Sequence, residues 1–490
     1  MNLFEIIKQN ALKYPKKIAL VIENKEYSYE IFYKLIVQTI NNLKNNNFNK
    51  NSKVLIVEDN TLEHVLALFS LSYINAIAIP TGTYYSNNHL SDIIKITNAD
   101  SIIGNKNHCN FFKKNSKIKN FLCTEKSNKF SFFFKTNNNN ISPKKKINKD
   151  KKYIITMSSG STSKPKPIIF SQNTKIIRYN LFRDLYKINN KDNFIVTSPI
   201  DHSLGMRTLF VPLLEGCTCV VMRKFLVPQY CELIKKYKIT FSVLVANQIY
   251  EILENRNYFK NFYLKKGLVS ASAKLFPKAK SKLIKKKINL YEMYGAAEIG
   301  TVTSINLLKD KKNLKSVGKS YNRNIKIKIL SENNVPQKPG KIGEIACKTP
   351  GEFEEYYDSK ILNRNAYYKK FFKTGDIGYL NNKGYLFFLS RKKNIIRRSG
   401  ITIYPEDIEN IFLKDAKVKE VAVIGKETKI VTKIYLFILK SNNLNESYIR
   451  NICLKKLSKF QIPNQIIFLK KFPKTNLGKI NKVKLLRLVR

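Results

Sequence analysis

A run of small, hydroxylated residues is the first segment of this chain that could do chemistry. It lies between two apolar stretches that we predict to be strands, ends on Lys166, and begins with Ser158, Ser159, Gly160, Ser161 and Thr162. Backbone N–H groups and hydroxyls in such a run can surround a polyphosphate, and the lysine adds a mobile cation. The run is not a Walker loop, because the second glycine and the Lys-Ser/Thr end are missing. A serine-rich surface turn is the other interpretation of the run by itself.

Four further segments contain acidic or basic residues. Their functional interpretation depends on the order of these segments along the chain. Residues 294–298 read YGAAE and residues 373–376 read KTGD; each by itself fits a buried turn or an ordinary β-turn. Residues 391–409 read RKKNIIRRSGITIYPEDIE, a longer and more specific string. Residues 473–480 read PKTNLGKI. Because the chain is so rich in lysine, a Gly-Lys pair can occur by chance. The pair in this segment is significant only because of the residues around it and its position in the chain.

Two shorter segments complete the set. Residues 197–205, TSPIDHSLG, contain the pattern Pro-x-x-His-x-x-Gly around His202. Alternatively, this histidine is a polar residue whose hydrogen bonds are satisfied at the start of a helix and which has no part in catalysis. Residues 270–275 read SASAKL, a run made mainly of small residues.

In this order, the segments resemble those of the adenylate-forming superfamily, which includes acyl-CoA synthetases, coumarate-CoA ligases, luciferases and peptide-synthetase adenylation domains. The resemblance covers nearly the whole chain, with the run at 158–166 matching the phosphate loop. It implies ATP and Mg²⁺ as ligands. The nucleotide-binding residues that it implies are Ser158, Ser159, Gly160, Ser161, Thr162, Lys166, Ser272, Tyr294, Gly295, Ala297, Asp376 and Arg391.

The resemblance also implies individual roles. Tyr294 would pack on adenine, and Glu298 would hold Mg²⁺. Asp376 would accept hydrogen bonds from the ribose hydroxyls, a role that suits an acceptor-only carboxylate. Lys479 would reach the α-phosphate and the substrate carboxylate, because a point charge on a flexible stem can meet charge as it develops. His202 would lie beside the acyl carboxylate.

The chain departs from the family pattern at four positions. Ser163 and Pro167 stand where the phosphate loop usually has glycines, so backbone freedom is lost, and Pro167 also lacks an N–H donor. Ala297 replaces a threonine whose hydroxyl would contact phosphate or metal. Lys393 stands at the hinge position, where aspartate is usual, although some plant ligases and luciferases also carry lysine there. We expect these changes to affect the rate more than the reaction type.

The resemblance implies an ATP-dependent, AMP-forming acid–thiol ligase. A carboxylic acid would attack the α-phosphate, and rotation about Lys393 would then open a route for the thiol of CoA or of phosphopantetheine. Since eleven residues follow Lys479, any acyl or peptidyl carrier protein would be a separate partner. Asp201 lies beside His202 and not where amino-acid-activating members place an aspartate, so we favour a non-amino acid.

Two alternatives remain open. The first is a stand-alone amino-acid adenylation domain that loads a carrier protein in trans. The second is a basic binding protein that keeps the fold with weakened catalysis, suggested by Ser163, Pro167, Ala297 and the formal net charge of +54.

The positive charge by itself would suggest nucleic acid as a partner. The 89 lysines and arginines are, however, spread along the whole chain, together with abundant Asn and Ile and no Trp. AT-rich codons specify Lys, Asn and Ile, so we favour codon bias as the cause and do not expect nucleic-acid binding. The charge would still attract anionic substrates such as ATP.

These residues must be positioned by an α/β fold. Apolar strand-like runs alternate with helical patterns over residues 51–104 and again from 153, which predicts a parallel sheet covered on both faces. The pattern weakens over 111–152, where FLC and FSFFF would form edge strands. Residues 325–385 read as antiparallel strands separated by turns.

We therefore predict a large, multi-layer α/β N-terminal domain over residues 1–390, with a β-rich subdomain at about 320–390. A small α+β C-terminal domain, residues 391–490, would follow, and the resemblance implies that it is a mobile lid. No uncharged apolar run approaches the ~18 residues that span a bilayer, and the N-terminus lacks the layout of a signal peptide. We expect a cytoplasmic location.

Overall fold

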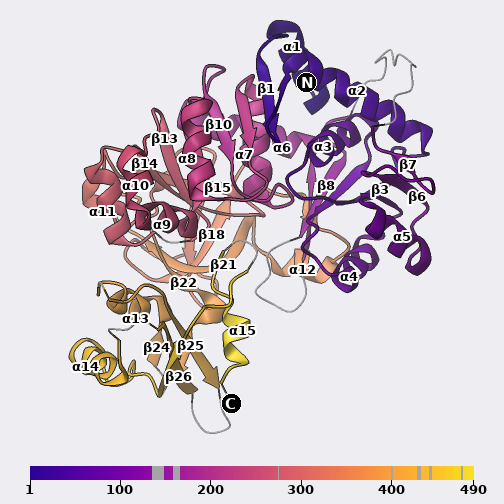
Figure 1. Cartoon of the computed structure of the whole chain (residues 1–490). Helices are drawn as coiled ribbons and strands as arrows, with labels where there is room; N and C mark the ends of the chain where they lie inside the picture. Colours follow the sequence, from indigo (N-terminus) through magenta and orange to yellow (C-terminus); the bar gives the residue numbers. More distant parts are fainter. Residues whose placement is uncertain are drawn as a thin grey trace.

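The computed structural model describes residues 1–134, 148–157, 166–273, 275–398, 401–415, 417–427, 432–440, 444–475 and 478–489. Figure 1 shows a large body made of two sheets and their helices, with the C-terminal part, in yellow, lying below it. The strands of the body come from the whole of the first three quarters of the chain. The predicted fold class, a large α/β domain followed by a small C-terminal domain, is confirmed.

An eight-stranded sheet occupies one side of the body, in the order β19-β9-β8-β4-β3-β5-β6-β7. Its centre is parallel, with β3 between β4 and β5, and apolar residues are buried on both faces of these strands. The predicted weak strands at FLC and FSFFF are β6 and β7, and they lie at the edge. The bounds are β3 Lys53–Val57, β4 Ile77–Thr81, β5 Ser101–Gly104, β6 Asn120–Cys123, β7 Ser131–Phe132, β8 Lys152–Met157, β9 Pro167–Ser171 and β19 Glu355–Tyr356.

A nine-stranded sheet occupies the other side, in the order β16-β15-β14-β13-β12-β10-β11-β1-β2. Strands β10 to β13 are parallel to their neighbours, whereas β14 and β15 form an antiparallel pair. The N-terminal strand β1 lies beside β11, almost two hundred residues away in the sequence. The bounds are β1 Ile18–Ile22, β2 Lys25–Ser28, β10 Asn193–Val196, β11 Thr218–Val221, β12 Phe241–Val245, β13 Gly267–Ala271, β14 Leu290–Ala296, β15 Gly300–Asn306 and β16 Lys319–Ser320.

Helices fill three layers around the two sheets. Five of them share one hydrophobic core with strands of both sheets: α1 Leu3–Lys13, α2 Tyr29–Asn45, α3 Leu62–Ile74, α6 Gln172–Tyr186 and α7 Ser203–Glu215. Because α3 lies inside this core, almost all of its residues are buried. The outer faces are covered by α4 Asn87–Thr97 and α5 Lys106–Asn115 on one side, and by α8 Val227–Lys236, α9 Ala246–Glu254, α10 Arg256–Asn261 and α11 Pro277–Lys285 on the other.

The predicted antiparallel segment is a separate five-stranded sheet in which β18 and β22 flank the long strand β21. Figure 1 places it between the nine-stranded sheet and the C-terminal domain. The bounds are β17 Lys326–Leu330, β18 Gly343–Lys348, β20 Tyr367–Tyr368, β21 Phe371–Leu380 and β22 Leu386–Arg391, with helix α12 Lys360–Asn365.

The C-terminal part has its own sheet, β25-β26-β27, and its own hydrophobic core, which begins at Ile396. Helices α13 and α14 pack on that sheet, and α13 also contacts β22 of the preceding sheet. The bounds are β23 Ile396–Arg398, β24 Ile401–Ile403, α13 Pro405–Phe412, β25 Val421–Glu427, β26 Thr432–Leu439, α14 Glu446–Lys456, β27 Gln465–Leu469 and α15 Lys482–Leu486, with the short 3₁₀ turn η2 Lys392–Asn394.

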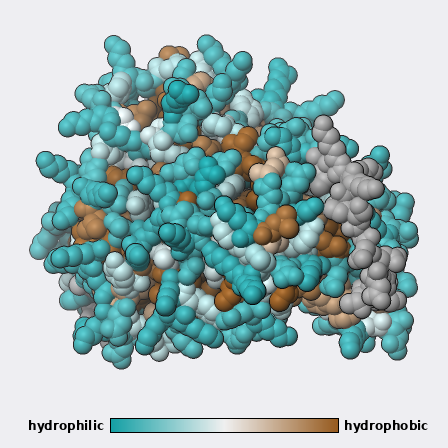
Figure 2. Space-filling model, turned by 90° about the horizontal axis from the view of Figure 1, so that it is seen from above, coloured by the Kyte–Doolittle hydropathy of each residue, from teal (hydrophilic) through white to brown (hydrophobic). Residues whose placement is uncertain are grey.

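The surface is mainly hydrophilic. On the face seen in Figure 2, apolar side chains form small patches separated by hydrophilic ones. Within the described ranges, no helix is both long enough and apolar enough to cross a membrane.

Candidate active site

Two strands of the five-stranded sheet bring Asp376 and Arg391 together. The two residues lie opposite each other in the antiparallel pair β21–β22, and Arg391 Nε is 2.7 Å from Asp376 Oδ1. Tyr294, near the end of β14, donates its hydroxyl hydrogen to Asp376 Oδ2 over 2.8 Å. Burial raises the pKa of the Asp376 carboxyl, whereas Arg391 and Tyr294 oppose that rise. The result is a buried carboxylate whose oxygens can still accept further hydrogen bonds.

Lys479 approaches this pair from the small domain. It closes a tight loop in which Thr475 N donates to Lys479 O over 2.7 Å and Gly478 has a φ of +72°. In the same loop, Lys474 Nζ donates to Asn247 Oδ1 of α9 over 3.2 Å. This contact attaches the loop to the large domain, so that Lys479 faces the site.

The pKa of the Lys479 side chain reflects how close it lies to Asp376 and Arg391. Burial and repulsion from Arg391 lower the pKa of the Lys479 ammonium to about 8, and attraction to Asp376 opposes the shift. At pH 7, roughly nine in ten molecules would still carry the charge, because the pKa lies about one unit higher. Lys479 therefore lies close to two residues that were predicted to bind the nucleotide, and its own contact with the α-phosphate and the substrate carboxylate stays a prediction.

Glu298 lies in the turn between β14 and β15. Its Oε1 accepts a hydrogen bond from the Tyr356 hydroxyl over 2.9 Å. Arg178 of α6 fixes the turn, because its guanidinium donates to Ala297 O over 2.9 Å and to Glu298 O over 2.7 Å. The carboxylate itself is only partly used by these contacts.

This carboxylate fits a magnesium site that is completed by the nucleotide. Mg²⁺ is commonly held by one or two carboxylates together with substrate phosphates and water. Within the part of the chain that the structure describes, no three His, Cys, Asp or Glu side chains are grouped to hold a metal ion. The remaining ligands would therefore come from phosphate oxygens and water.

Two more lysines add positive charge to the site. The Lys166 ammonium lies 5.5 Å from the ring centroid of Tyr356, the tyrosine that binds Glu298. Burial, and then repulsion from Arg391 and Lys166, lower the pKa of Lys393 in η2. Four cations from three segments thus gather near Asp376 and Glu298, and these cations are Lys166, Arg391, Lys393 and Lys479. Such an excess of positive charge suits a polyphosphate.

His202 immediately precedes α7 and is held by polar partners. The Tyr84 hydroxyl lies 3.1 Å from His202 Nε2 and also donates to the Asp201 carboxylate. Asp201 Oδ2 is 3.9 Å from the same histidine nitrogen. Asp201, which is buried, is therefore engaged by Tyr84 and helps to orient the imidazole.

The spacing of Pro199, His202 and Gly205 has a steric basis. A Cβ atom on Gly205 would lie 2.0 Å from Pro199 O, closer than any real contact. The same carbonyl accepts a hydrogen bond from His202 N over 3.2 Å. Only glycine lets the first turn of α7 pack against this loop, so the motif sets the position of the histidine.

The remaining predicted nucleotide contacts occupy the ends of neighbouring strands. Ser272 follows β13 with a φ of +68°, and β13 is the parallel neighbour of β14, which carries Tyr294 and Gly295. A Cβ on Gly295 would lie 2.0 Å from Gly300 O, so this position requires glycine. Contact of Ser272, Gly295 and Ala297 with a nucleotide stays a prediction.

Most of the predicted phosphate loop lies outside the described residues: Ser158, Ser159, Gly160, Ser161 and Thr162, together with Ser163. Pro167 is described and begins β9, where it pairs with Met157. Proline is tolerated at the first position of a strand, and its carbonyl accepts a hydrogen bond from Tyr357 N over 2.9 Å. Pro167 is thus compatible with the strand that follows the loop.

Several residues of the site were not predicted from the sequence. Tyr84 and Tyr356 hold His202 and Glu298, but nothing in their local patterns marks them. Lys175 and Arg178 lie on the buried side of α6, one turn apart. The sequence offered a single signal for this pair. The two cations lie one turn apart on a helix that was expected to cover a sheet, so they share one face of that helix.

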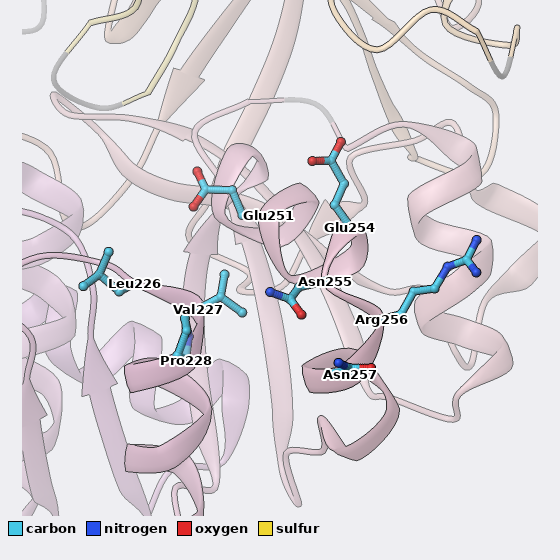
Figure 3. A pocket seen from close by; sticks show the side chains of 8 residues that line it. All are labelled: Leu226, Val227, Pro228, Glu251, Glu254, Asn255, Arg256 and Asn257. Atoms are coloured by element: carbon cyan, nitrogen blue, oxygen red, sulfur yellow. The ribbon is translucent and has the colours of Figure 1, made fainter.

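A wide, open cleft of about 680 Å³ lies elsewhere, between the start of α8 and the end of α9 (Figure 3). Its eight lining residues include none of the predicted site residues. Asn247, which binds Lys474, donates to Glu251 at the edge of this cleft over 2.8 Å. The cleft therefore borders the contact between the two domains, and the predicted site residues do not line it.

Comparison with known proteins gives the chain a family. The sequence model described as AMP-binding enzyme matches residues 7–357, and the model described as AMP-binding enzyme C-terminal domain matches residues 407–479. A 2-succinylbenzoate–CoA ligase from Listeria monocytogenes is 25% identical over 489 residues, with 96% of each chain covered. An indoleacetate–CoA ligase from Aromatoleum aromaticum is 25% identical over 337 residues, which are 67% of this chain and 66% of that relative.

Solved structures share the fold over the full length. The o-succinylbenzoate CoA synthetase MenE from Bacillus subtilis, in complex with the acyl-adenylate intermediate OSB-AMP, superposes with a TM-score of 0.87 at 19% identity and covers 99% of this chain and 98% of its own. The amide bond synthetase McbA from Marinactinospora thermotolerans superposes with a TM-score of 0.88 at 15% identity, and the match covers 100% of both chains.

Proposed function

The chain belongs to the AMP-binding enzyme family, and we propose that it is an ATP-dependent, AMP-forming ligase that joins a carboxylic acid to a thiol. The observation that carries this proposal is the approach of Lys479, from the small domain, to the ion pair between buried Asp376 and half-exposed Arg391. CoA ligases among the relatives support the reaction type.

In the first step, an oxygen of the substrate carboxylate would attack the α-phosphorus of ATP. The bond from that phosphorus to the oxygen that bridges to the β-phosphate would break, and pyrophosphate would leave with its electron pair. Lys479, protonated at neutral pH, would stabilise the negative charge that develops on the α-phosphate oxygens. The product is an acyl-adenylate.

The other residues of the site would bind and orient the nucleotide. Asp376 would accept hydrogen bonds from the ribose, with Arg391 beside it. Lys166 would compensate phosphate charge, and its position beside Tyr356 and Glu298 supports this role. Mg²⁺, held by Glu298 and phosphate oxygens, would neutralise further charge on the leaving pyrophosphate.

In the second step, a thiol would attack the acyl carbon, and AMP would leave with the electron pair of the broken carbon–oxygen bond, while the thiol proton passes to solvent. Lys479 lies in the site in this conformation, so the loop that carries it would have to withdraw to admit a thiol. We propose that η2 is the hinge and that Lys393 moves with it.

CoA is our preferred acceptor, because the curated relatives reported above are CoA ligases. Phosphopantetheine on a separate acyl or peptidyl carrier protein is the second candidate. The acid is proposed to lack an α-amino group, since Asp201, the carboxylate nearest to His202, is already engaged by the Tyr84 hydroxyl.

Product analysis tests the proposal. With ATP, Mg²⁺, CoA and a panel of fatty and aryl acids, we expect AMP, pyrophosphate and acyl-CoA to form in equal amounts. Stimulation by a single amino acid, with transfer to a carrier protein and not to CoA, would indicate the amino-acid-activating alternative. Formation of ADP, or no acid-dependent cleavage of ATP by folded protein, would contradict the proposed function.

A further inference from the structure

Asn247, in the first turn of α9, contacts the loop that carries Lys479 at two points. At the beginning of the loop, Lys474 Nζ donates to Asn247 Oδ1 over 3.2 Å. Gly478, which directly precedes Lys479, has a φ of +72°, and a Cβ built on it would lie 3.6 Å from Asn247 Cβ. The part of the loop that carries Lys479 thus packs on the same side chain that binds the beginning of the loop.

The loop is also held together by hydrogen bonds of its own. Its two ends pair as a β-bridge between Lys474 and Ile480, and Gly478 N donates to Thr475 O over 2.8 Å. Lys479 N donates to Thr475 Oγ1 over 3.2 Å. These bonds do not involve the large domain, so they can persist when the loop leaves it. The loop can therefore approach or leave α9 as one unit, and Lys479 moves with it.

Both partners of the hydrogen bond between Lys474 and Asn247 have a second partner in their own domain. Lys474 Nζ lies 2.9 Å from Glu420 Oε1 of the small domain, and the Lys474 side chain is 29% exposed. Asn247 Nδ2 donates over 2.8 Å to Glu251 Oε1, one turn further along α9. When the loop withdraws, neither partner is left as a buried polar group without a hydrogen bond. Breaking this contact therefore carries only a small penalty.

The contact lies away from the hinge. Lys392 of η2 pairs with Glu344 of β18 over 2.7 Å, which links the hinge to the five-stranded sheet. Asn247 belongs instead to α9, which packs on β12 and β13 of the nine-stranded sheet. Two attachments on different sheets restrict rotation of the small domain about the hinge more than one attachment does. Loss of the contact at Asn247 would leave the attachment at the hinge in place.

We propose that Asn247 is a positioning residue that holds the Lys479 loop in place for the first step and releases it for the second. This inference rests on the proposed function. Asn247 acts through Lys479, whose position it sets, because a contact made in one of two arrangements shifts the population toward that arrangement. Its side chain is a neutral amide, so the bond to Lys474 is weaker than an ion pair of the same geometry. Such a bond favours the docked loop and still allows withdrawal in each turnover.

The test measures the two steps separately. Acid-dependent ATP–pyrophosphate exchange reports the first step, and transfer of the acyl group from a pre-formed acyl-adenylate to CoA reports the second. The variant Asn247→Leu removes both hydrogen-bonding atoms and keeps the size of the side chain. The matched control is Asn257→Leu, because Asn257 is an exposed asparagine of α10, the helix that follows α9.

In Asn247→Leu, we expect exchange to be about tenfold slower than in the wild type, because the docked loop is less populated. Transfer from the acyl-adenylate should be unchanged or faster, since this step needs the loop withdrawn. Asn257→Leu should match the wild type in both steps. Equal losses in the two steps, or full exchange activity in folded Asn247→Leu, would overturn the inference and leave the proposed function intact.

A double variant shows whether the hydrogen bond itself is responsible. Lys474→Met removes the other partner of the bond and should also slow exchange. When Asn247→Leu is added to Lys474→Met, we expect no further loss, because the bond is already absent. Losses that multiply in the double variant would show that the two side chains act independently, which would contradict the proposed contact.

Limited proteolysis tests the role of Asn247 without any substrate. Trypsin cleaves after lysine, and Lys479 is only partly exposed while its loop is docked. Cleavage after Lys479, followed by mass spectrometry, should be faster in Asn247→Leu than in the wild type and in Asn257→Leu. If no acid supports exchange, the proposed function fails, and this difference would still support the role of Asn247 in docking. Equal rates in the three proteins would contradict it.

Discussion

At the scale of single residues, the site depends on charges that are held out of water. Asp376 and Lys479 both show shifted pKa values whose largest cause is burial, and in each case the other residue opposes the shift. Each charge is therefore stabilised by the presence of the other. An incoming nucleotide would meet charges that are already in place, which is how preorganised sites stabilise developing charge.

The lowered pKa of Lys479 predicts a pH dependence of adenylation. The protonated ammonium is the active form, so activity should be retained below pH 8 and lost as the pH rises through the value of about 8. Lys479→Arg keeps its charge at high pH. We expect its rate to be lower, but its loss of activity in base to move to higher pH. A pH–rate profile of ATP–pyrophosphate exchange measures this shift, and an unchanged alkaline limb in the arginine variant would rule out titration of this lysine.

At the scale of secondary-structure elements, a loop and a helix start determine where His202 lies. The close approach of Gly205 to Pro199 O leaves no room for a side chain. Gly205→Ala should therefore displace this loop and destabilise the fold by about 1–3 kcal/mol. We expect a larger loss in exchange activity than in Tm, because the imidazole moves with the loop.

Gly340→Ala is the matched control for that experiment. Gly340 also has an unusual backbone, with a φ of +85°, but a Cβ there would meet no atom within 4 Å. It should lose a little stability and keep its activity. Equal losses in the two variants, in denaturant melts and in exchange, would show that the effect at Gly205 is not specific to the site.

The elements themselves were largely predictable from the sequence. The apolar, strand-like patterns that begin near residues 51 and 153 correspond to the strands β3, Lys53–Val57, and β8, Lys152–Met157. These features depend on local patterns. The pairing of β1 with β11 was not predicted, because strand order depends on partners that lie far apart in the chain.

Site residues that belong to one of the family motifs could be predicted from the sequence, whereas site residues outside the motifs could not. Asp376, Arg391 and Lys479 were expected near one nucleotide, and the structure brings their charges together. Lys175 and Arg178 were overlooked, because a cation on a helix usually faces solvent and only tertiary packing shows that it is buried.

At the scale of the whole molecule, the net charge of +54 is the most unusual property. Dispersed positive charge raises the local concentration of an anionic substrate without defining a specific surface. We expect the KM for ATP to rise several-fold between about 50 mM and about 500 mM salt, because screening shortens the range of this attraction. A neutral osmolyte is the control, and it should have no effect.

The same salt series tests the alternative that the chain is a basic binding protein with weakened catalysis. Tight, salt-sensitive binding of nucleic acid by a protein that shows no adenylation would favour that function. A KM for ATP that does not respond to salt would show that the dispersed charge has no part in substrate capture.

The most direct test of the central claim is acid-dependent ATP–pyrophosphate exchange in the wild type, in Lys479→Ala and in Lys484→Ala, the last of which removes an exposed lysine nearby. We predict exchange in the wild type and in Lys484→Ala, and a loss of at least about 100-fold in Lys479→Ala without a change in Tm. Full exchange activity in folded Lys479→Ala would contradict the claim that the small domain supplies the group that stabilises adenylation.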